Sequence, residues 1–188
     1  MPVGGVWSHN GGVIDKLLEV CTYSGIVLTS SQTERKGKEM ATRGIVAKAT
    51  KKGWEGRYCH WDNYPERMTY ALGALVARDG VDKVIQTLIT DTASWSQIEP
   101  LAKSGTPNLY EDKALVEGYG YAHTDIALDD DGSLFTQDDT ELAWCAYLYI
   151  IHETHLEVRR IEHDEKGNDV TIFEKSYPWE NIAIVVTV

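Results

Sequence analysis

The sequence predicts an α+β fold, in which a mainly antiparallel sheet carries a pair of helices packed on one face. About six short stretches are rich in β-branched and aromatic residues, and most of them are joined by short turns. Two helical patterns follow one another directly in the first half of the chain. Strands and helices do not alternate as they would in a doubly wound fold, so an antiparallel arrangement is favoured.

The first two expected strands form a hairpin. Residues 42–50 alternate weakly between apolar and polar positions, and residues 54–61 contain several β-favouring aromatic side chains. Lys51-Lys52-Gly53 supplies the turn between them. Because strand side chains alternate between faces, Tyr58, His60 and Asp62 are expected to form a polar row on one face.

Two helices are expected after this row. Apolar residues recur at helical spacing from Met68 to Val76, Pro65 suits the first helical position, and Gly80 suits the position after the end. Asp62 or Asn63 could cap this helix, as a purely structural use of the polar row. A second apolar stripe predicts a helix over residues 81–89.

The second half of the chain is expected to complete the sheet. Residues 91–108 are rich in Thr, Ser, Gly and Pro and predict a long ordered loop, in which Trp95 either stacks on a ligand or pins the loop. The remaining expectations are a helical turn over 111–117, strand entry at 118–121, a central strand covered on both faces over 144–151, a hairpin tip at 152–155, and strands at 156–161, 170–175 and 182–188.

Two patterns raise metal binding, and neither satisfies its motif. Asp129-Asp130-Asp131-Gly132-Ser133 would place Ala127 at the first position of a calcium loop, so we interpret it as an acidic turn. His152-Glu153-Thr154-His155 lacks the helical spacing of a zinc-protease motif. We therefore expect no metal. The sequence also lacks a G-x-G-x-x-G motif and a P-loop, so we expect no cofactor.

Composition excludes several classes of protein. The three cysteines are far apart, which argues against a zinc ribbon or a disulfide framework and favours a cytoplasmic setting. No apolar run has the length of a membrane span. The net charge is −11, and residues 111–188 hold eighteen acidic and five basic side chains, so direct nucleic-acid binding is not expected.

The central motif resembles a known family. Met40-Ala41-Thr42-Arg43-Gly44-Ile45 and then Gly56-x-Tyr58-x-His60-Trp61-Asp62-x-Tyr64-Pro65-Glu66 resemble small phage and actinobacterial proteins that carry M-A-T-R-S/G followed by G-x-Y-x-H-W-D-G-Y-P-E. The resemblance covers most of residues 40–188. Asn63 stands where the family usually has Gly, so a positive φ is expected there. The resemblance implies a phage-type accessory protein in the host cytoplasm and transfers no catalytic role.

The resemblance begins at Met40, which divides the chain into residues 1–39 and a single α+β domain of residues 40–188. The first segment is polar and charged between Ser30 and Lys38. It is either a translated leader or a genuine N-terminal extension, and the mass of the natural product distinguishes these alternatives.

Three hypotheses for function follow. The first is a non-catalytic binder of a small polar or anionic, nucleotide-like ligand or of a host protein. Its candidate ligand-binding residues are Arg43, Tyr58, His60, Trp61, Asp62, Tyr64, Glu66, Arg67 and Trp95. The second is a small hydrolase that uses a His60–Asp62 pair. The third is an acidic decoy that occupies a DNA-binding protein through carboxylates such as Asp129, Asp130 and Asp131. The sequence does not indicate an oligomeric state.

Overall fold

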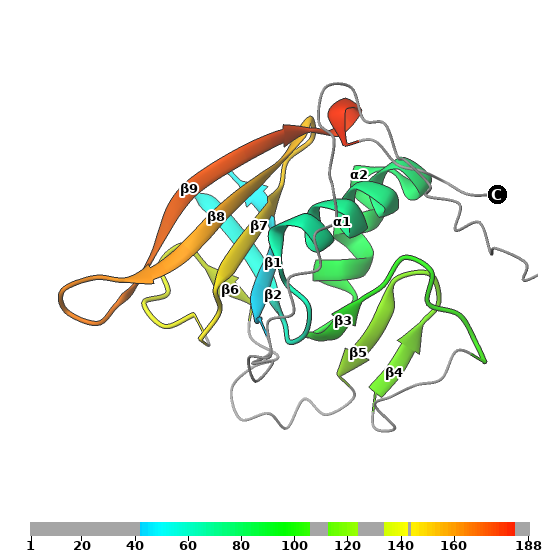
Figure 1. Cartoon of the computed structure of the whole chain (residues 1–188), viewed down its shortest axis with the longest axis horizontal. Helices are drawn as coiled ribbons and strands as arrows, with labels where there is room; N and C mark the ends of the chain where they lie inside the picture. The colour runs from blue at the N-terminus through cyan, green and yellow to red at the C-terminus, as the bar shows by residue number, and fades with distance from the viewer. Residues whose placement is uncertain (1–41, 106–112, 124–133, 143, 183–188) are drawn as a thin grey trace, which may run out of the picture. The chain divides into compact units, whose positions relative to one another are not determined.

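The computed structural model describes residues 42–105, 113–123, 134–142 and 144–182 (Figure 1). Grouping by contacts divides the chain into residues 1–36 and residues 37–188, and the described residues all belong to the second unit. The boundary expected after residue 39 therefore stays a prediction. The N-terminal segment and the acidic run at residues 129–133 lie outside the described residues.

The described strands form one mixed and mostly antiparallel sheet, which with its helices confirms the predicted α+β class. The strands are β1 (Gly44–Thr50), β2 (Gly53–Cys59), β3 (Trp95–Ile98), β4 (Lys113–Val116), β5 (Gly120–His123), β6 (Phe135–Thr136), β7 (Tyr147–Ile151), β8 (His155–His163) and β9 (Asp169–Pro178). Their order is β4-β5-β3-β2-β1-β7-β8-β9, and β6 pairs with β2. The β1–β7 and β2–β3 ladders are parallel.

The predicted first hairpin is confirmed. β1 and β2 pair antiparallel, from Gly44 opposite Cys59 to Thr50 opposite Gly53. Gly56 lies in the middle of this ladder, where an added Cβ would come within 2.6 Å of the Ala47 Cβ. The close approach of the two strands therefore requires glycine at this position.

The first predicted helix is confirmed as α1 (Pro65–Asp79), with Pro65 in its first turn and Gly80 just after its end at φ 82°. Its N-cap residue is Tyr64, and no side chain caps the helix. The expected cap from Asp62 or Asn63 is therefore wrong. Proline supplies the preset φ at the start, and no capping side chain is used.

The second predicted helix consists of two parts. α2 (Val81–Ile85) continues into a π-helical segment, η1 (Gln86–Thr90). The Trp95 indole N–H donates to the Leu88 carbonyl at 2.9 Å, and Arg57 Nε donates to the Ile89 carbonyl at 2.9 Å. Side chains from neighbouring strands thus satisfy carbonyls where the helix departs from regular geometry.

The sheet is covered on both faces, as expected for its central strands. One face packs against both helices through residues such as Val46, Tyr149 and Val158. On the opposite face, alternate residues such as Ile45 and Leu148 share a core with Phe135 and Leu142. Figure 1 shows α1 and α2 lying together beside the central strands. This two-sided burial explains the continuous apolar character of β7.

Three expected elements differ from the structure. The stretch expected as a long loop, residues 91–108, contains β3, because backbone pairing with β2 and β5 orders a Ser-rich segment. The turn expected as helical over 111–117 contains β4, which pairs with β5 over four residues. The strand expected from residue 144 begins at Tyr147, since Trp144 has a φ of 58° and lies outside the ladder.

No helix within the described part of the chain combines the length and the apolar character needed to cross a lipid bilayer. Next to the last described residue, Ile182, lies a short 3₁₀ turn, η2 (Trp179–Asn181). The strand expected over 182–188 falls almost entirely outside the described residues.

Candidate functional site

The polar row begins at the end of β2, where Tyr58 and His60 meet. The Tyr58 hydroxyl lies 2.7 Å from His60 Nδ1, and the two rings meet edge to face with centroids 5.8 Å apart. The two residues lie on one side because side chains two positions apart project the same way from an extended backbone. This part of the predicted row is therefore confirmed.

Burial controls the protonation of this pair. Burial raises the pKa of Tyr58 to about 12, although the nearby Arg43 charge opposes the increase. Burial, together with the positive charges of Arg43 and Lys113, lowers the pKa of His60 below its usual value. At neutral pH a protonated phenol can therefore donate to Nδ1 of a neutral imidazole. That hydrogen bond leaves the ring proton on Nε2, where it can donate to a ligand.

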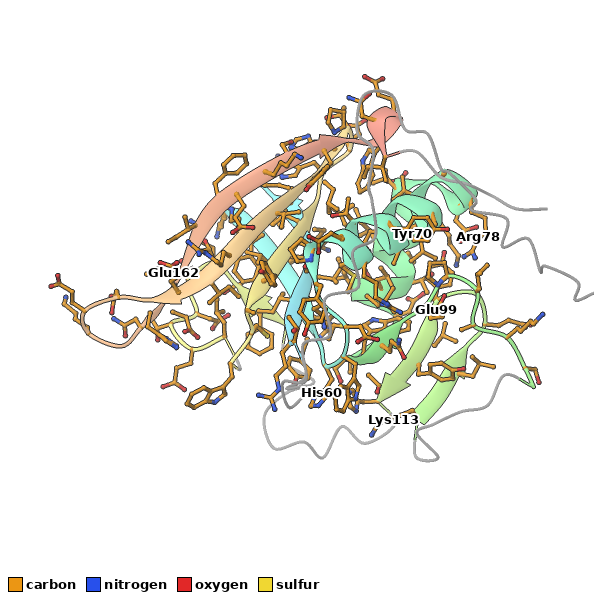
Figure 2. All side chains as sticks on the ribbon, viewed as in Figure 1. His60, Tyr70, Arg78, Glu99, Lys113 and Glu162 are labelled. Carbon is orange, nitrogen blue, oxygen red and sulfur yellow. The ribbon has the colours of Figure 1, made fainter. Side chains whose placement is uncertain are left out.

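Sheet register brings further cationic or donor side chains to this edge. Arg43 directly precedes β1, whose first residue Gly44 pairs with Cys59, the residue before His60. His123 ends β5 and pairs with Lys113 at the start of β4, and its ring centroid lies 6.4 Å from that of His60. Figure 2 shows His60 and Lys113 at the same end of the molecule. Four strand ends thus contribute to one cluster.

Backbone hydrogen bonds to the start of β3 hold the cluster in place. The His60 N–H donates to the Trp95 carbonyl at 2.9 Å, and the His123 N–H donates to the Ser94 carbonyl at 3.2 Å. The two imidazoles therefore flank the start of β3. The Trp61 ring lies 4.7 Å from the His60 ring, edge to face, and is partly exposed.

Asp62 leaves the row. Its backbone has a φ of 59°, in the left-handed region that Asp tolerates better than most residues. Its carboxylate accepts a hydrogen bond from Gln97 Nε2 at 3.0 Å and lies 3.8 Å from Arg67 Nε. The structure therefore pairs His60 with Tyr58, whereas the hydrolase hypothesis paired it with Asp62.

Asn63 is a buried structural anchor, and the expectation of a positive φ at this residue is wrong, because Asp62 makes the turn instead. Its side-chain Nδ2 donates to the carbonyls of Thr42, Cys59 and Trp61 at 2.9–3.0 Å. Its own carbonyl accepts a hydrogen bond from the Tyr149 hydroxyl at 2.7 Å. Asn63 thereby ties the motif to the start of β1 and to β7.

Arg67 and Trp95 have structural partners. Arg67 donates to the Ile98 carbonyl at 3.2 Å and to the Glu99 carboxylate at 3.1 Å. Trp95 is fully buried in the core beside the helices, so its ring pins β3, the alternative to ligand stacking. The structure does not bring either side chain into the His60 cluster.

Tyr64 and Glu66 lie at the start of α1, and both are exposed. Burial, Glu174 and then Glu66 raise the pKa of Tyr147, and Tyr64 contributes less. The charges that lower the pKa of His60 are instead those of Arg43 and Lys113. The motif therefore divides into a cluster around His60 and a separate group of side chains near Tyr147.

The described cysteines do not supply a nucleophile. Cys59 and Cys145 are both buried and free of disulfides. Burial raises the pKa of Cys59 to about 11 and also raises that of Cys145. Since the thiolate is the reactive form, both thiols are suited to packing and not to attack on a substrate.

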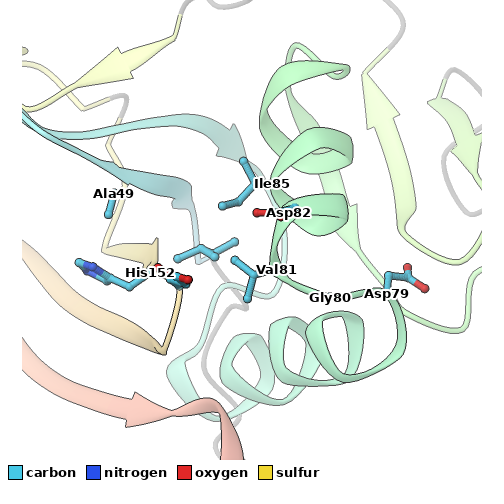
Figure 3. Close-up of a pocket in the computed structure, with 9 residues that line it drawn as sticks. Ala49, Asp79, Gly80, Val81, Asp82, Ile85 and His152 are labelled. Carbon is cyan, nitrogen blue, oxygen red and sulfur yellow. The ribbon is translucent and has the colours of Figure 1, made fainter.

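A separate hollow of about 450 Å³ lies between the β7–β8 connection and the start of α2 (Figure 3). Its polar lining includes Asp79, Asp82, His152 and Glu153, and among the described residues that line it there is no Lys or Arg. This acidic lining disfavours an anionic ligand. The His60 cluster, in contrast, gathers positive charge in a chain whose net charge is −11.

Acidic residues of the described second half are partly neutralised. Glu157 pairs with Arg159 at 2.6 Å, and Arg160 lies 2.6 Å from Glu162 and 3.5 Å from Glu174. The decoy hypothesis depends on Asp129, Asp130 and Asp131, which fall outside the described residues. It stays a prediction without support from the described surface.

Sequence reasoning missed His123 and Lys113. His123 ends β5, and the two residues before it, Tyr121 and Ala122, are buried. A polar ring at the end of an apolar strand was the signal in the sequence that could have indicated a site residue. Lys113 carried no distinguishing local signal. Its position depends on pairing between β4 and β5, which connects residues on both sides of a turn.

Comparison with known proteins adds no assignment. A scan against protein-family models found no match, and searches of curated proteins and of solved structures found none either.

Proposed function

We propose that this chain is a phage-type accessory protein that binds a small anionic, nucleotide-like ligand at the His60 cluster without catalysing its conversion. The observation that carries the proposal is the convergence of Arg43, Lys113 and His123 on the Tyr58–His60 pair at one sheet edge. These groups provide positive charge and N–H donors, which are the features that recognise phosphate or carboxylate oxygens.

An aromatic surface beside the donors favours a nucleotide over a bare anion. Trp61 lies against His60 and keeps part of its surface exposed. A planar base can stack on such a ring while its phosphate contacts the cationic groups. The family resemblance of the motif is consistent with an accessory role and adds no ligand identity.

Binding without catalysis is favoured over hydrolysis. Asp62 is committed to Gln97 and Arg67, so it does not orient His60. The two described thiols are buried and have raised pKa values. No activated nucleophile is thus found among the residues that the structure describes.

Thermal unfolding with a ligand panel tests the proposal. The panel contains inorganic phosphate, nucleoside mono-, di- and triphosphates, cyclic nucleotides and sugar phosphates, each matched for ionic strength. A ligand at a hundredfold its Kd should stabilise the protein by about 2.7 kcal/mol. His60→Ala and Arg43→Gln should abolish or strongly reduce that shift, whereas His163→Ala, at an exposed histidine on β8, should retain it.

The outcomes separate the alternatives. Absence of a shift across the panel at millimolar concentration would contradict the proposal. A shift that persists in both His60→Ala and Arg43→Gln would place the ligand elsewhere. Conversion of a ligand during incubation, lost in His60→Ala, would favour the hydrolase hypothesis instead.

A further inference from the structure

The connection between β7 and β8 brings together three side chains that can ligate a metal ion. His152, His155 and Glu157 each place one ligand atom within 4.8 Å of the others. Among the described residues, no other group of three or more His, Cys, Asp or Glu side chains meets this spacing. His155 and Glu157 lie two residues apart on β8, so strand alternation places them on one face, and the hairpin brings His152 beside them.

We propose that His152, His155 and Glu157 bind one divalent transition-metal ion, with Zn²⁺ the best fit to this ligand set. Imidazole nitrogen and carboxylate oxygen are common zinc ligands. Three protein ligands leave a further coordination position for water or an external group.

The distance between two of the ligand atoms already suits a shared metal. His152 Nε2 lies 3.1 Å from the nearer Glu157 carboxylate oxygen, Oε2. Two ligands bonded to a tetrahedral zinc at about 2.0–2.1 Å are separated by roughly 3.3 Å. An ion that binds here takes the place of the proton in this hydrogen bond, which is released to solvent or moves to His152 Nδ1, and the two atoms then separate by a few tenths of an ångström.

The third ligand lies directly beside the first. The His152 and His155 rings are stacked, with centroids 4.1 Å apart and planes 9° apart. His155 Nδ1 lies 3.1 Å from the Thr154 hydroxyl. When Nδ1–H donates to that hydroxyl, the Nε2 lone pair is left to bind the ion, which is the usual role of a partner behind a ligating histidine.

Outer contacts fix the remaining ligand and the backbone. Arg159 Nε donates to Glu157 Oε1 at 2.6 Å, which leaves Oε2 to face His152. The His152 N–H donates to the His155 carbonyl at 2.9 Å and closes the hairpin. Trp179 donates its indole N–H to the His152 carbonyl at 3.0 Å and its backbone N–H to the Thr154 carbonyl at 3.2 Å.

These hydrogen bonds hold the ligand-bearing backbone before the metal arrives. Because the two rings are stacked nearly parallel, one of them must rotate about its side-chain torsions so that both nitrogen lone pairs point at one ion. The hollow of Figure 3 begins at the same hairpin, where His152 and Glu153 form part of its wall. Its acidic lining is compatible with a nearby cation.

Calorimetric titration of the full-length protein with ZnCl₂ tests the proposal. One ion per chain is expected, and His155→Gln and Glu157→Gln should each weaken binding about tenfold or more. Titration with CoCl₂ gives a second readout, because a nitrogen- and oxygen-bound Co²⁺ of low coordination number absorbs visible light. That absorption should appear in the wild type and be lost in His155→Gln.

Two matched variants serve as controls. His163→Gln removes a histidine that lies 2.8 Å from a carboxylate of Asp169, at the other end of β8. His60→Ala removes a histidine of the His60 cluster. Both should bind Zn²⁺ as the wild type does. Circular dichroism of every variant verifies that the fold is retained, and Glu157→Gln gives an independent test if His155→Gln is unfolded.

Three results would overturn the proposal. The first is the absence of Zn²⁺ binding at concentrations up to about 100 μM, where a site with three protein ligands should be occupied. The second is wild-type affinity in folded His155→Gln and Glu157→Gln. The third is a loss of binding in His60→Ala or His163→Gln comparable with the loss in His155→Gln.

Discussion

Asn63 illustrates how one side chain can determine the geometry of the motif. It is fully buried, and its amide group serves the carbonyls of Thr42, Cys59 and Trp61. The Thr42 carbonyl, just before β1, also accepts the backbone N–H of Asn63 at 3.0 Å. The side-chain amide therefore adds to the backbone hydrogen bonds that join the start of β1 to the end of β2.

Removing that amide should be costly. Asn63→Ala removes a donor from the carbonyls of Cys59 and Trp61, whereas the Thr42 carbonyl keeps the backbone N–H of residue 63. Each buried group left unsatisfied costs about 1–3 kcal/mol. We expect the free energy of unfolding to fall by about 2–4 kcal/mol, measured by urea denaturation. Asn181→Ala, at an exposed asparagine in η2, is the control and should change it by less than about 0.5 kcal/mol. Equal losses in the two variants would contradict this role.

His60 should make stability depend on pH in a defined direction. The pKa of His60 is lowered in the folded protein by burial, Arg43 and Lys113. Above the ordinary pKa of 6.5 the ring is neutral in both states. As the pH falls below 6.5, the unfolded chain takes up the proton first, so the folded state loses stability until the pH passes the lowered pKa.

This dependence can be measured by thermal unfolding between pH 7.5 and pH 5. The midpoint should fall on acidification, and His60→Gln should remove part of the fall. The pKa of His152 is also lowered by burial and by His155, so a residual dependence should remain in His60→Gln and shrink further when His152 is also replaced. A steeper fall in His60→Gln than in the wild type would contradict the assignment.

At the scale of elements, local patterns predicted those parts of the fold that local physics controls. The β1–β2 hairpin follows from alternation around Lys51-Lys52-Gly53, and α1 follows from Pro65, an apolar stripe and Gly80. The Tyr58–His60 contact follows from strand alternation alone. These features require no information from distant residues.

Elements that depend on distant partners escaped prediction. β3 has only four residues and contains Ser96 and Gln97, so its strand character comes from pairing with β2 and β5. The same pairing places His123 beside His60, and no local spacing encodes that proximity. Asp62 took the left-handed conformation expected at Asn63, because the Asn63 amide is required in the interior.

The β1–β2 ladder should be sensitive to crowding at Gly56. An added Cβ would lie 2.6 Å from the Ala47 Cβ and 2.6 Å from the Val46 carbonyl oxygen, and backbone atoms cannot move aside freely. We expect Gly56→Ala to lower the free energy of unfolding by about 1–3 kcal/mol in urea denaturation.

Gly167→Ala provides a comparison for Gly56→Ala. Gly167 has a φ of 83° and no heavy atom within 4 Å of an added Cβ, so its replacement tests backbone conformation without crowding. A loss of about 1 kcal/mol is expected there. If Gly56→Ala were neutral, the strands would have to separate more easily than their buried contacts indicate.

For the whole molecule, the net charge of −11 and the positive His60 cluster predict opposite responses to salt. Raising NaCl from about 20 mM to about 300 mM shortens the Debye length from roughly 20 Å to about 6 Å. Screening of the repulsion between like charges should raise the unfolding midpoint of the free protein.

The same screening should weaken binding of a phosphate ligand, measured as a smaller ligand-induced shift of the unfolding midpoint. KCl should reproduce both effects. A midpoint that falls as NaCl is added would show that self-repulsion does not limit stability.

The parallel ladder between β1 and β7 has a consequence for how the chain is made. Gly44 pairs with Tyr147, so β1 leaves the ribosome long before its partner is synthesised. Until β7 emerges, one edge of β1 has only open backbone groups on that side, and the helix-facing core lacks Tyr149 and Ile151. Folding should therefore complete late in translation, and truncated nascent chains should be the form of this protein most prone to aggregate.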